Sequence, residues 1–260
     1  MSKLILSTLV AGAAFAGFMG TQIAQSSATG SGGATTSAKN SDDNARSPNP
    51  VVIELFTSQG CSSCPPADML AKRLAKDGSL LVISRPVTYW DRLGWKDTLA
   101  RPENTALQRS YARKGNSGSG VYTPQIIVNG GEGVVGSREG DVRSIVRRSR
   151  NTGPEIQVDR DSAGQVIVTI SGKSRHMASV SLLALSSSET VQIGRGENGG
   201  RKLHYTNVVK SETSLGSWQG DAESFPISAT NLNVKGADKY AVVLQRPGAG
   251  PIVGAKLLEI

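Results

Sequence analysis

The sequence predicts an α/β domain, with a central mixed sheet flanked by helices, followed by a small β-sandwich-like domain. Three observations predict this class. Short apolar runs alternate with segments of helical spacing between residues 51 and 150. The turn-forming stretch Asn151-Thr152-Gly153-Pro154 then interrupts the pattern. Beyond it, apolar residues alternate with polar ones, as in strands that bury one face. We therefore expect domains over residues 51–152 and 153–260, a division that a length of 260 residues allows.

The N-terminal part of the chain is expected to lie outside the fold. Lys3 precedes an apolar run over residues 4–19, and small-residue sites suited to cleavage follow, so residues 1–28 resemble a secretory signal. The run is shorter than the roughly 20 residues of a membrane span, so no stable membrane anchor is expected after cleavage. Residues 29–50 are rich in Ser, Gly, Thr, Ala and Asn, which predicts a flexible linker. The expected location is the periplasm or the outside of the cell.

The first predicted domain begins with a strand, a helix and a second strand. Residues 51–56 are apolar apart from Glu54, residues 67–76 have helical spacing, and residues 79–84 form another apolar run. This order predicts a parallel pair of strands joined by a right-handed crossover.

The rest of this domain follows in the longer segment after residue 84. We expect a helix over 102–114, a glycine-serine loop over 115–120, a strand over 126–129, a hairpin turn at 130–131, a return strand at 134–135 and a helix over 137–150. The predicted order of elements is β-α-β-α-β-β-α.

Alternation replaces helical periodicity in the second predicted domain. The alternating apolar positions are Val166, Val168 and Ile170, then Val180, Leu182 and Ala184. Apolar runs over 240–244 and 252–258 add further strands. Several strands separated by turn signals predict a small β-sandwich.

The formal net charge of +8 and the pI near 9.7 raise the question of nucleic-acid binding. The Lys and Arg residues are scattered, apart from residues 143–150 on a predicted helix. We therefore expect a solvated basic surface and no nucleic-acid partner.

The two cysteines of the chain, Cys61 and Cys64, have C-x-x-C spacing between the first strand and the first helix. Thiolates attack disulfides, and the unpaired N–H groups at a helix start favour the thiolate. Pro65 and Pro66 suit the first turn of that helix. We therefore expect Cys61 to be the attacking nucleophile in an exposed turn, and Cys64 to be the resolving thiol at the helix start.

A purely structural disulfide is the alternative. Disulfides persist in exported proteins, but a bridge that closes so short a loop contributes only about 2 kcal/mol on the chain-entropy model. A stabilising bridge would gain more by joining distant segments, so redox chemistry is the interpretation we favour.

The combination of strand, C-x-x-C, helix and a later proline leading into a strand resembles the thioredoxin-like superfamily. The stretch Phe56–Cys61 is also similar to the corresponding glutaredoxin segment. The resemblance implies a thioredoxin-like fold in which Pro124, preceded by Thr123, is a cis-proline that faces the cysteines and pairs with substrate backbone. An ordinary trans proline is the alternative.

Three motifs in order narrow the resemblance: F-T-S-Q-G-C-S-S-C-P-P-A-D at residue 56, V-T-Y-W-D-R-L-G-W-K-D at residue 87 and Y-T-P-Q at residue 122. They are similar to an uncharacterised family of exported bacterial proteins, domain of unknown function 1223. This family brings no established reaction. The dipeptide Ser62-Ser63 differs from that of thioredoxin, so the direction of electron flow stays unassigned.

Three further residues are candidates for the site. Glu54 lies in a buried strand, where thioredoxins carry an acid that assists proton transfer, although the offset here is not identical. Trp90 and Trp95 could contact substrate together with Thr123, and core packing is the alternative for both tryptophans. A carboxylate at the sheet edge paired with Lys or Arg is the alternative for Glu54.

The predicted function is thus an exported thiol–disulfide oxidoreductase that acts on a protein thiol or disulfide, with an unidentified redox partner and no cofactor or resident metal. Two alternatives remain open. Paired thiolates suit Cu(I), with His204 as a further candidate ligand, and a non-catalytic binding module could retain the fold. The glycine loop over 194–201 lacks the following helix that a phosphate site requires.

Overall fold

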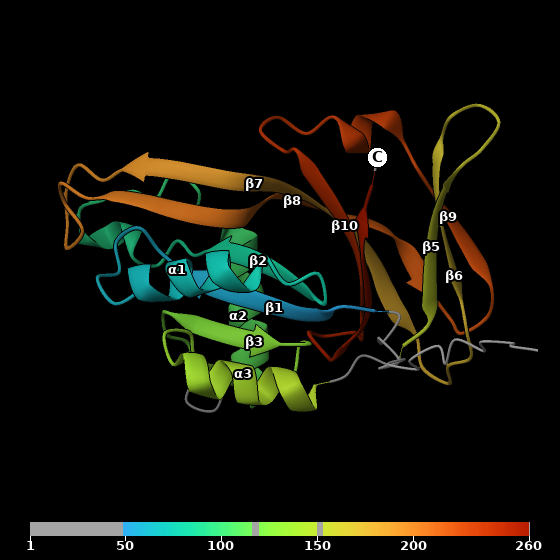
Figure 1. Ribbon diagram of the computed structural model, residues 1–260, viewed down its shortest axis with the longest axis horizontal. Helices are drawn as coiled ribbons and strands as arrows, with labels where there is room; N and C mark the ends of the chain where they lie inside the picture. The colour runs from blue at the N-terminus through green and yellow to red at the C-terminus, as the bar shows by residue number, and fades with distance from the viewer. Residues whose placement is uncertain (1–48, 116–119, 150–152, 260) are drawn as a thin grey trace, which may run out of the picture. The chain divides into compact units, whose positions relative to one another are not determined.

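The computed structural model describes residues 49–115, 120–149 and 153–259. The predicted signal and nearly all of the predicted linker lie outside these residues. Within them, three α-helices accompany two β-sheets (Figure 1): α1 (Pro65–Leu74), α2 (Pro102–Arg113) and α3 (Glu139–Arg148). None of the helices in these ranges is long and apolar enough to cross a membrane.

The larger sheet is mixed and has eight strands in the order β11-β10-β7-β8-β2-β1-β3-β4. Its strands are β1 (Val51–Thr57), β2 (Leu80–Pro86), β3 (Gln125–Val128), β4 (Gly133–Val135), β7 (Ala178–Gln192), β8 (Lys202–Trp218), β10 (Lys239–Gln245) and β11 (Ile252–Leu258). Strands β1 and β2 are parallel, as the strand-helix-strand pattern predicts. Strand β3 runs antiparallel to β1 and forms a hairpin with β4, as the Gly130-Gly131 signal predicts.

Helices cover both faces of this sheet around β1. Successive side chains of a strand point to opposite faces. Ile53 and Leu55 therefore pack against α1 and α3 in one buried cluster. Phe56 belongs to a second cluster with Tyr111 of α2 on the other face, where the two rings meet edge to face. Strand β1 is buried almost throughout because both of its faces are covered.

A smaller three-stranded sheet, in the order β5-β6-β9, packs against the C-terminal strands of the large sheet. It consists of β5 (Glu155–Arg160), β6 (Val166–Ser171) and β9 (Glu223–Ile227). Val168 of β6 shares a buried cluster with Val180 of β7 and Val242 of β10. The alternating apolar positions of β6 and β7 thus face each other across two layers.

The C-terminal strands do not form a separate sandwich, which corrects the predicted architecture. Strands β7, β8, β10 and β11 extend the sheet of β1, because β8 pairs with β2 in parallel at Ser84 and Val208. Two side chains reinforce this junction: Ser84 Oγ donates to the Thr206 carbonyl (2.7 Å), and Asn207 Nδ2 donates to the Val82 carbonyl (2.9 Å). The large sheet therefore contains strands from both sides of the predicted domain boundary at residues 152 and 153. That the two parts are separate folding units stays a prediction.

Strands β7 and β8 form a hairpin much longer than the sequence pattern predicts. They pair with each other from Ala178 and Trp218 as far as Gln192 and Lys202. Strand β8 lies against α1 (Figure 1). The loop that joins the two strands, residues 193–201, is called the hairpin tip below. The hairpin therefore brings the C-terminal half of the chain to the start of α1.

Candidate functional site

The two cysteines lie in the turn between β1 and α1 and form a disulfide, with their Cα atoms 5.4 Å apart. Cys64 is the N-cap of α1, and prolines occupy the first helical positions, as predicted. The Cys64 N–H donates to the Cys61 carbonyl (3.2 Å), and the Cys61 N–H donates to the Ser58 carbonyl (3.2 Å). Two hydrogen bonds within its own backbone thus hold the turn, in addition to the contacts from other elements described below.

Cys61 is buried, which corrects the expectation of an exposed turn. Both cysteines are 0 % exposed, whereas Ser62 and Ser63 between them are exposed. Segments distant in the sequence contact this turn, so the local sequence of the turn could not predict its burial. Ser63 Oγ lies 3.3 Å from Cys61 Sγ, so the serine hydroxyl can donate to the sulfur.

The hairpin tip holds the cysteine turn by its backbone. Asn198 is fully buried, and its Nδ2 donates to the carbonyls of Gln59 (3.0 Å) and Cys61 (2.9 Å). Arg201 fixes the amide by donating to Asn198 Oδ1 (2.7 Å). One buried side chain from the C-terminal half thus satisfies two carbonyls around the first cysteine.

A second residue of the tip, Glu197, reaches the dipeptide between the cysteines. Its Oε2 accepts a hydrogen bond from the Ser62 N–H (3.0 Å). Hydrogen bonds from the Ser62 hydroxyl and N–H lower the pKa of Glu197. The residue is exposed and carries a negative charge next to the cysteine turn.

Gln59 connects the turn to the segment that contains Trp95. Its Oε1 accepts from Trp95 Nε1 (2.8 Å), and its backbone N–H donates to Asp97 Oδ2 (2.8 Å). Trp95 also packs against Gly194 of the hairpin tip, where a Cβ would lie 2.9 Å from the indole. Trp95 therefore joins the tip to the turn, which agrees with the packing alternative for this residue.

The Thr123–Pro124 peptide bond is cis, as predicted. Trp90 Nε1 donates to Thr123 Oγ1 (2.8 Å), and the Trp90 Cβ lies 3.2 Å from the Cβ position of Gly60. Gln108 of α2 holds this loop by donating to the Tyr122 carbonyl (2.7 Å). Trp90 thus contacts both the threonine before the proline and the residue before Cys61. Whether Trp90, Trp95 and Thr123 contact substrate stays a prediction.

Glu54 has a different setting from the one expected of a proton-transfer acid. It lies on the sheet face opposite α1, and Arg85 Nε donates to its Oε1 at 2.6 Å. Tyr111 Oη donates to its Oε2 at 2.6 Å. Both carboxylate oxygens are therefore occupied by a buried ion pair and a buried phenol.

Asp68 is the buried acid that adjoins the cysteine turn. It lies in the first turn of α1, where its N–H donates to the Cys64 carbonyl (3.1 Å). Thr57 Oγ1 donates to its Oδ1 (2.8 Å), and its Oδ2 is buried with no hydrogen-bond partner. Burial raises the pKa of Asp68 to about 8, although the Thr57 hydrogen bond opposes this and nearby Asp97 adds to it.

Two more buried groups accompany Asp68. Burial raises the pKa of Asp97 to about 6, against the hydrogen bonds donated by the Gln59 and Leu99 N–H groups. Tyr205 of β8 is also buried, and its hydroxyl has no hydrogen-bond partner. Burial, with the charges of Asp68 and Asp97, raises the pKa of Tyr205. A group of buried titratable side chains therefore lies near the start of α1.

Sequence reasoning missed Asp68, Glu197 and Asn198. An acid in the first turn of a helix is favoured by the helix dipole whether or not it is functional, so Asp68 carried no distinguishing signal. Asn198 and Cys61 are separated by 137 positions in the sequence, so no local sequence pattern could reveal their contact. The polar glycine loop over 194–201 was the one visible signal, since a loop of this composition allows close approach to another backbone.

The described residues contain no group of three or more His, Cys, Asp or Glu side chains that could hold a metal ion. His204 is exposed on β8, and its Nδ1 lies 2.8 Å from Thr190 Oγ1. The copper alternative therefore stays a hypothesis that rests on the cysteine pair.

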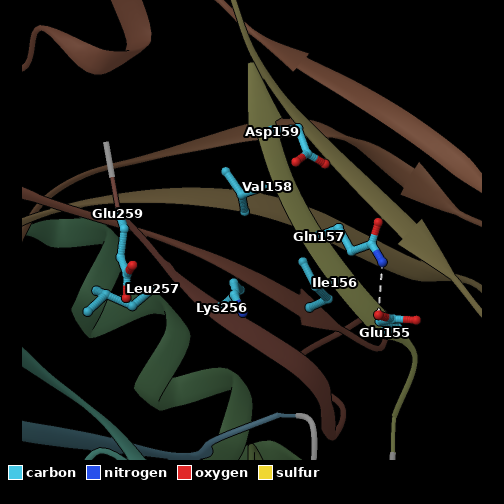
Figure 2. Close-up of a pocket in the computed structure, with 8 residues that line it drawn as sticks. All are labelled: Glu155, Ile156, Gln157, Val158, Asp159, Lys256, Leu257 and Glu259. Atoms are coloured by element: carbon cyan, nitrogen blue, oxygen red, sulfur yellow. Dashed lines mark hydrogen bonds between the residues drawn. The ribbon is translucent and has the colours of Figure 1, made fainter. Parts of the chain in front are cut away.

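A surface depression of about 500 Å³ lies between β5 and β11 (Figure 2). Its lining consists of residues 155–159 of β5, Lys256 and Leu257 of β11, and Glu259. None of the predicted site residues lines it, so it is separate from the cysteine turn.

Comparison with known proteins finds similarity to solved structures. No functionally curated protein is significantly similar to the chain. A crystal structure of a protein from Agrobacterium tumefaciens is similar, with 31 % sequence identity and a TM-score of 0.68, over 80 % of this chain and 93 % of the other. HBP35 of Porphyromonas gingivalis has 13 % identity and a TM-score of 0.50, over 82 % of this chain and 75 % of the other, and this likeness concerns the fold alone.

The family assignment rests on a longer match. Residues 52–245 match the family described as "Protein of unknown function (DUF1223)". This range contains β1 except for Val51, the cysteine turn, the Thr123–Pro124 loop, the hairpin tip and all of β10. The chain therefore belongs to the DUF1223 family.

Proposed function

We propose that this protein is an exported thiol–disulfide oxidoreductase that uses Cys61 and Cys64. One observation carries the proposal: the two cysteines form a disulfide at the N-terminus of a proline-led helix, next to a group of buried titratable side chains. The positive end of the α1 helix dipole favours a thiolate at the cysteines.

The order of elements supports the same proposal. A strand, the cysteine turn, a helix, a parallel strand, an antiparallel hairpin and a further helix is the arrangement that the resemblance to the thioredoxin-like superfamily implies. We propose a thioredoxin-like arrangement for this part of the chain, with β7, β8, β10 and β11 as an extension of its sheet. The proposed location is the periplasm or the outside of the cell, where disulfides persist.

In the proposed reaction, the Cys61 thiolate attacks one sulfur of a substrate disulfide and releases the other as a thiolate. The Cys64 thiolate then attacks Cys61 Sγ, forms the Cys61–Cys64 disulfide and releases the second substrate thiolate. Two electrons pass from the dithiol to the substrate, and the two cysteine protons end on the substrate thiols. The reverse sequence oxidises a substrate dithiol. A dithiol or disulfide partner must restore the starting form.

The other site residues have proposed roles in this reaction. The cis Pro124, whose carbonyl accepts from the Gly136 N–H, would hold the Thr123 backbone toward the substrate chain, with Trp90 and Trp95 at the edge of that surface. Asp68 would take up the Cys64 proton, since an acid whose pKa is about 8 exchanges protons near neutral pH. We propose Asp68 for this role rather than Glu54, whose carboxylate is paired with Arg85.

The test is disulfide exchange with an insulin substrate and a dithiothreitol or glutathione buffer. The wild-type protein is expected to accelerate exchange, and Cys61→Ser is expected to abolish it. Cys64→Ser should retain the first attack and accumulate a mixed disulfide at Cys61, detectable by mass spectrometry. Unchanged exchange in Cys61→Ser, or no acceleration by the wild type, would contradict the proposal.

Burial of the cysteines favours one second candidate, a non-catalytic binding module with a permanent disulfide. Both cysteines are 0 % exposed, so a substrate reaches Cys61 only after its cover moves. The two candidates differ in one measurable property. A disulfide that glutathione buffers at physiological potentials do not open would support the binding module, whereas reversible opening would support the oxidoreductase.

A further inference from the structure

The dipeptide between the cysteines contacts a charged side chain from a distant part of the chain. Glu197, in the hairpin tip, lies 135 residues from Ser62, and its Oε2 accepts the Ser62 N–H at 3.0 Å. The neighbouring Asn198 holds the Cys61 carbonyl, so the tip is fixed against the turn and Glu197 cannot drift from it freely. The carboxylate is thus held beside the residue that follows Cys61.

Other charged and titratable groups face the same turn. Arg201 donates a hydrogen bond to Asn198 Oδ1, and Asp68 and Asp97 are buried in the protein interior. Ser63 Oγ can donate to Cys61 Sγ. Ser63 therefore favours a thiolate at Cys61, whereas Glu197 adds negative charge and occupies the N–H group of Ser62 in the turn before the helix.

We propose that Glu197 stabilises the Cys61–Cys64 disulfide relative to the dithiol and so makes the pair more reducing. This inference rests on the proposed function for its biological meaning. Glu197 acts through the cysteine turn and does not touch substrate, so it is a positioning residue whose effect is electrostatic.

The physical reason is the charge that reduction creates. Two electrons enter the disulfide, the S–S bond breaks, and Cys61 becomes a thiolate while Cys64 takes up a proton. The new negative charge forms at the residue next to Ser62, whose N–H binds the Glu197 carboxylate, and like charges repel. The reduced form is therefore destabilised, whereas the uncharged disulfide is not. Because Glu197 is exposed, salt screens the repulsion.

Glu197→Gln is the informative change, because the amide oxygen can still accept the Ser62 N–H while the charge is lost. Glu223→Gln is the matched control: it removes the same charge from an exposed position on β9. Each full-length protein is equilibrated with dithiothreitol redox buffers, and the ratio of dithiol to disulfide is measured. The Cys61 thiolate is titrated separately by its ultraviolet absorbance.

Glu197→Gln is expected to shift the equilibrium toward the dithiol by about threefold to tenfold, which corresponds to about 14 to 30 mV. The Cys61 titration should move to lower pH, and Glu197→Lys should shift both quantities further. At about 1 M salt, where the Debye length falls to about 3 Å, the difference from wild type should shrink. Glu223→Gln should match wild type.

A Glu197→Gln equilibrium equal to that of wild type, or shifted toward the disulfide, would overturn the inference. So would a pair that stays oxidised in every buffer in both proteins. Failure of the proposed function is separable, because it appears in the insulin assay. A protein that shows the Glu197 shift but does not turn over insulin would support the inference and contradict the proposed enzyme activity.

Discussion

Asp68 combines two properties that rarely occur together in an aspartate. It is 3 % exposed, and one of its carboxylate oxygens has no hydrogen-bond partner. An unpaired buried carboxylate is costly, and the usual response is to hold a proton. The pKa of about 8 expresses this balance. Asp68 is therefore mostly neutral at pH 7 and mostly charged at pH 9.

The sign of the stability effect follows from this shift. An aspartate in the unfolded chain has a pKa of about 3.9, whereas Asp68 in the folded protein has a pKa of about 8. Between these values the folded protein holds a proton that the unfolded chain has lost. The stabilisation is therefore complete below about pH 4 and is lost as pH rises through about 8.

Asp68→Asn should remove this dependence. Relative to the variant, wild type is expected to lose unfolding free energy between pH 5 and 8, by at most about 1.4 kcal/mol per pH unit. Urea unfolding at pH 5, 6.5 and 8 measures it, with the exposed Asp159→Asn as control. Parallel pH curves for wild type and Asp68→Asn would contradict the assignment.

In the exchange assay at pH 7, we expect Asp68→Asn to slow turnover on the order of tenfold.

The residues that the sequence identified share a local signal. Cys61 and Cys64 are defined by their spacing, and Pro124 by its position before a strand. The resemblance to thioredoxins, which carry an acid on the same strand, suggested proton transfer for Glu54, but Arg85 on the adjacent strand accounts for its burial. The partner that decides the role of a buried acid comes from tertiary structure, so a pattern in one strand cannot identify it.

At the scale of elements, the hairpin tip is the cover of the cysteine turn. The Asn198 amide satisfies two carbonyls of the turn and Trp95 packs against Gly194. These contacts are hydrogen bonds and van der Waals contacts that a local movement of the tip can break. We therefore expect an element from the C-terminal half to limit access to Cys61.

Asn198→Ala should loosen this cover. The change removes both hydrogen bonds to the turn and leaves buried carbonyls without donors, which costs about 1 to 3 kcal/mol. We expect the disulfide to be reduced by dithiothreitol several-fold faster than in wild type, measured by thiol labelling over time. Asn233→Ala, at an exposed position after the 3₁₀ helix Ala229–Leu232, is the control. Equal reduction rates in wild type and Asn198→Ala would show that the tip does not limit access.

The elements of the first half were predictable and those of the second half were only partly so. In residues 51–148, runs of strand or helical periodicity coincide with β1, α1, β2, α2 and α3, with boundaries differing by about two residues. The C-terminal strands were visible at β6, β10 and β11 through their alternation or apolar runs. The length of β7 and β8 could not be predicted, because β7 changes its pattern along the strand. It is buried on both faces over 182–186 and becomes more polar toward the hairpin tip. Pairing partners cannot be deduced from which face of a strand is apolar.

At the scale of the molecule, a buried polar network joins both halves of the chain. Arg85 of β2 lies between Glu54 of β1 and Glu212 of β8, at 2.6 and 3.0 Å. Tyr111 of α2 links Glu54 to Gln245 of β10, whose Nε2 donates to the tyrosine hydroxyl at 2.6 Å. This buried network of charged and hydrogen-bonded side chains thus includes residues from five helices and strands.

Arg85→Met should therefore destabilise the whole described fold. It leaves the Glu54 carboxylate buried without its cation, and loss of one partner of a buried pair costs about 3 to 5 kcal/mol. Arg148→Met is the matched control, because the ion pair of Arg148 with Glu132 is exposed and is worth at most about 1 kcal/mol. Urea unfolding followed by circular dichroism measures both. Similar losses in the two variants would contradict a structural role for the buried network.

The β7–β8 hairpin is held at both ends and also between them, where β7 pairs with β10 and β8 pairs with β2. At one end, Val180 and Trp218 are clamped in the core beneath the three-stranded sheet; at the other, Asn198 is bonded to the cysteine turn. A strand rises about 3.3 Å per residue, so the span between the supports approaches 50 Å. Both ends belong to one continuous pair of strands. The grip on the disulfide is therefore a property of the C-terminal core as much as of the loop that makes the contact.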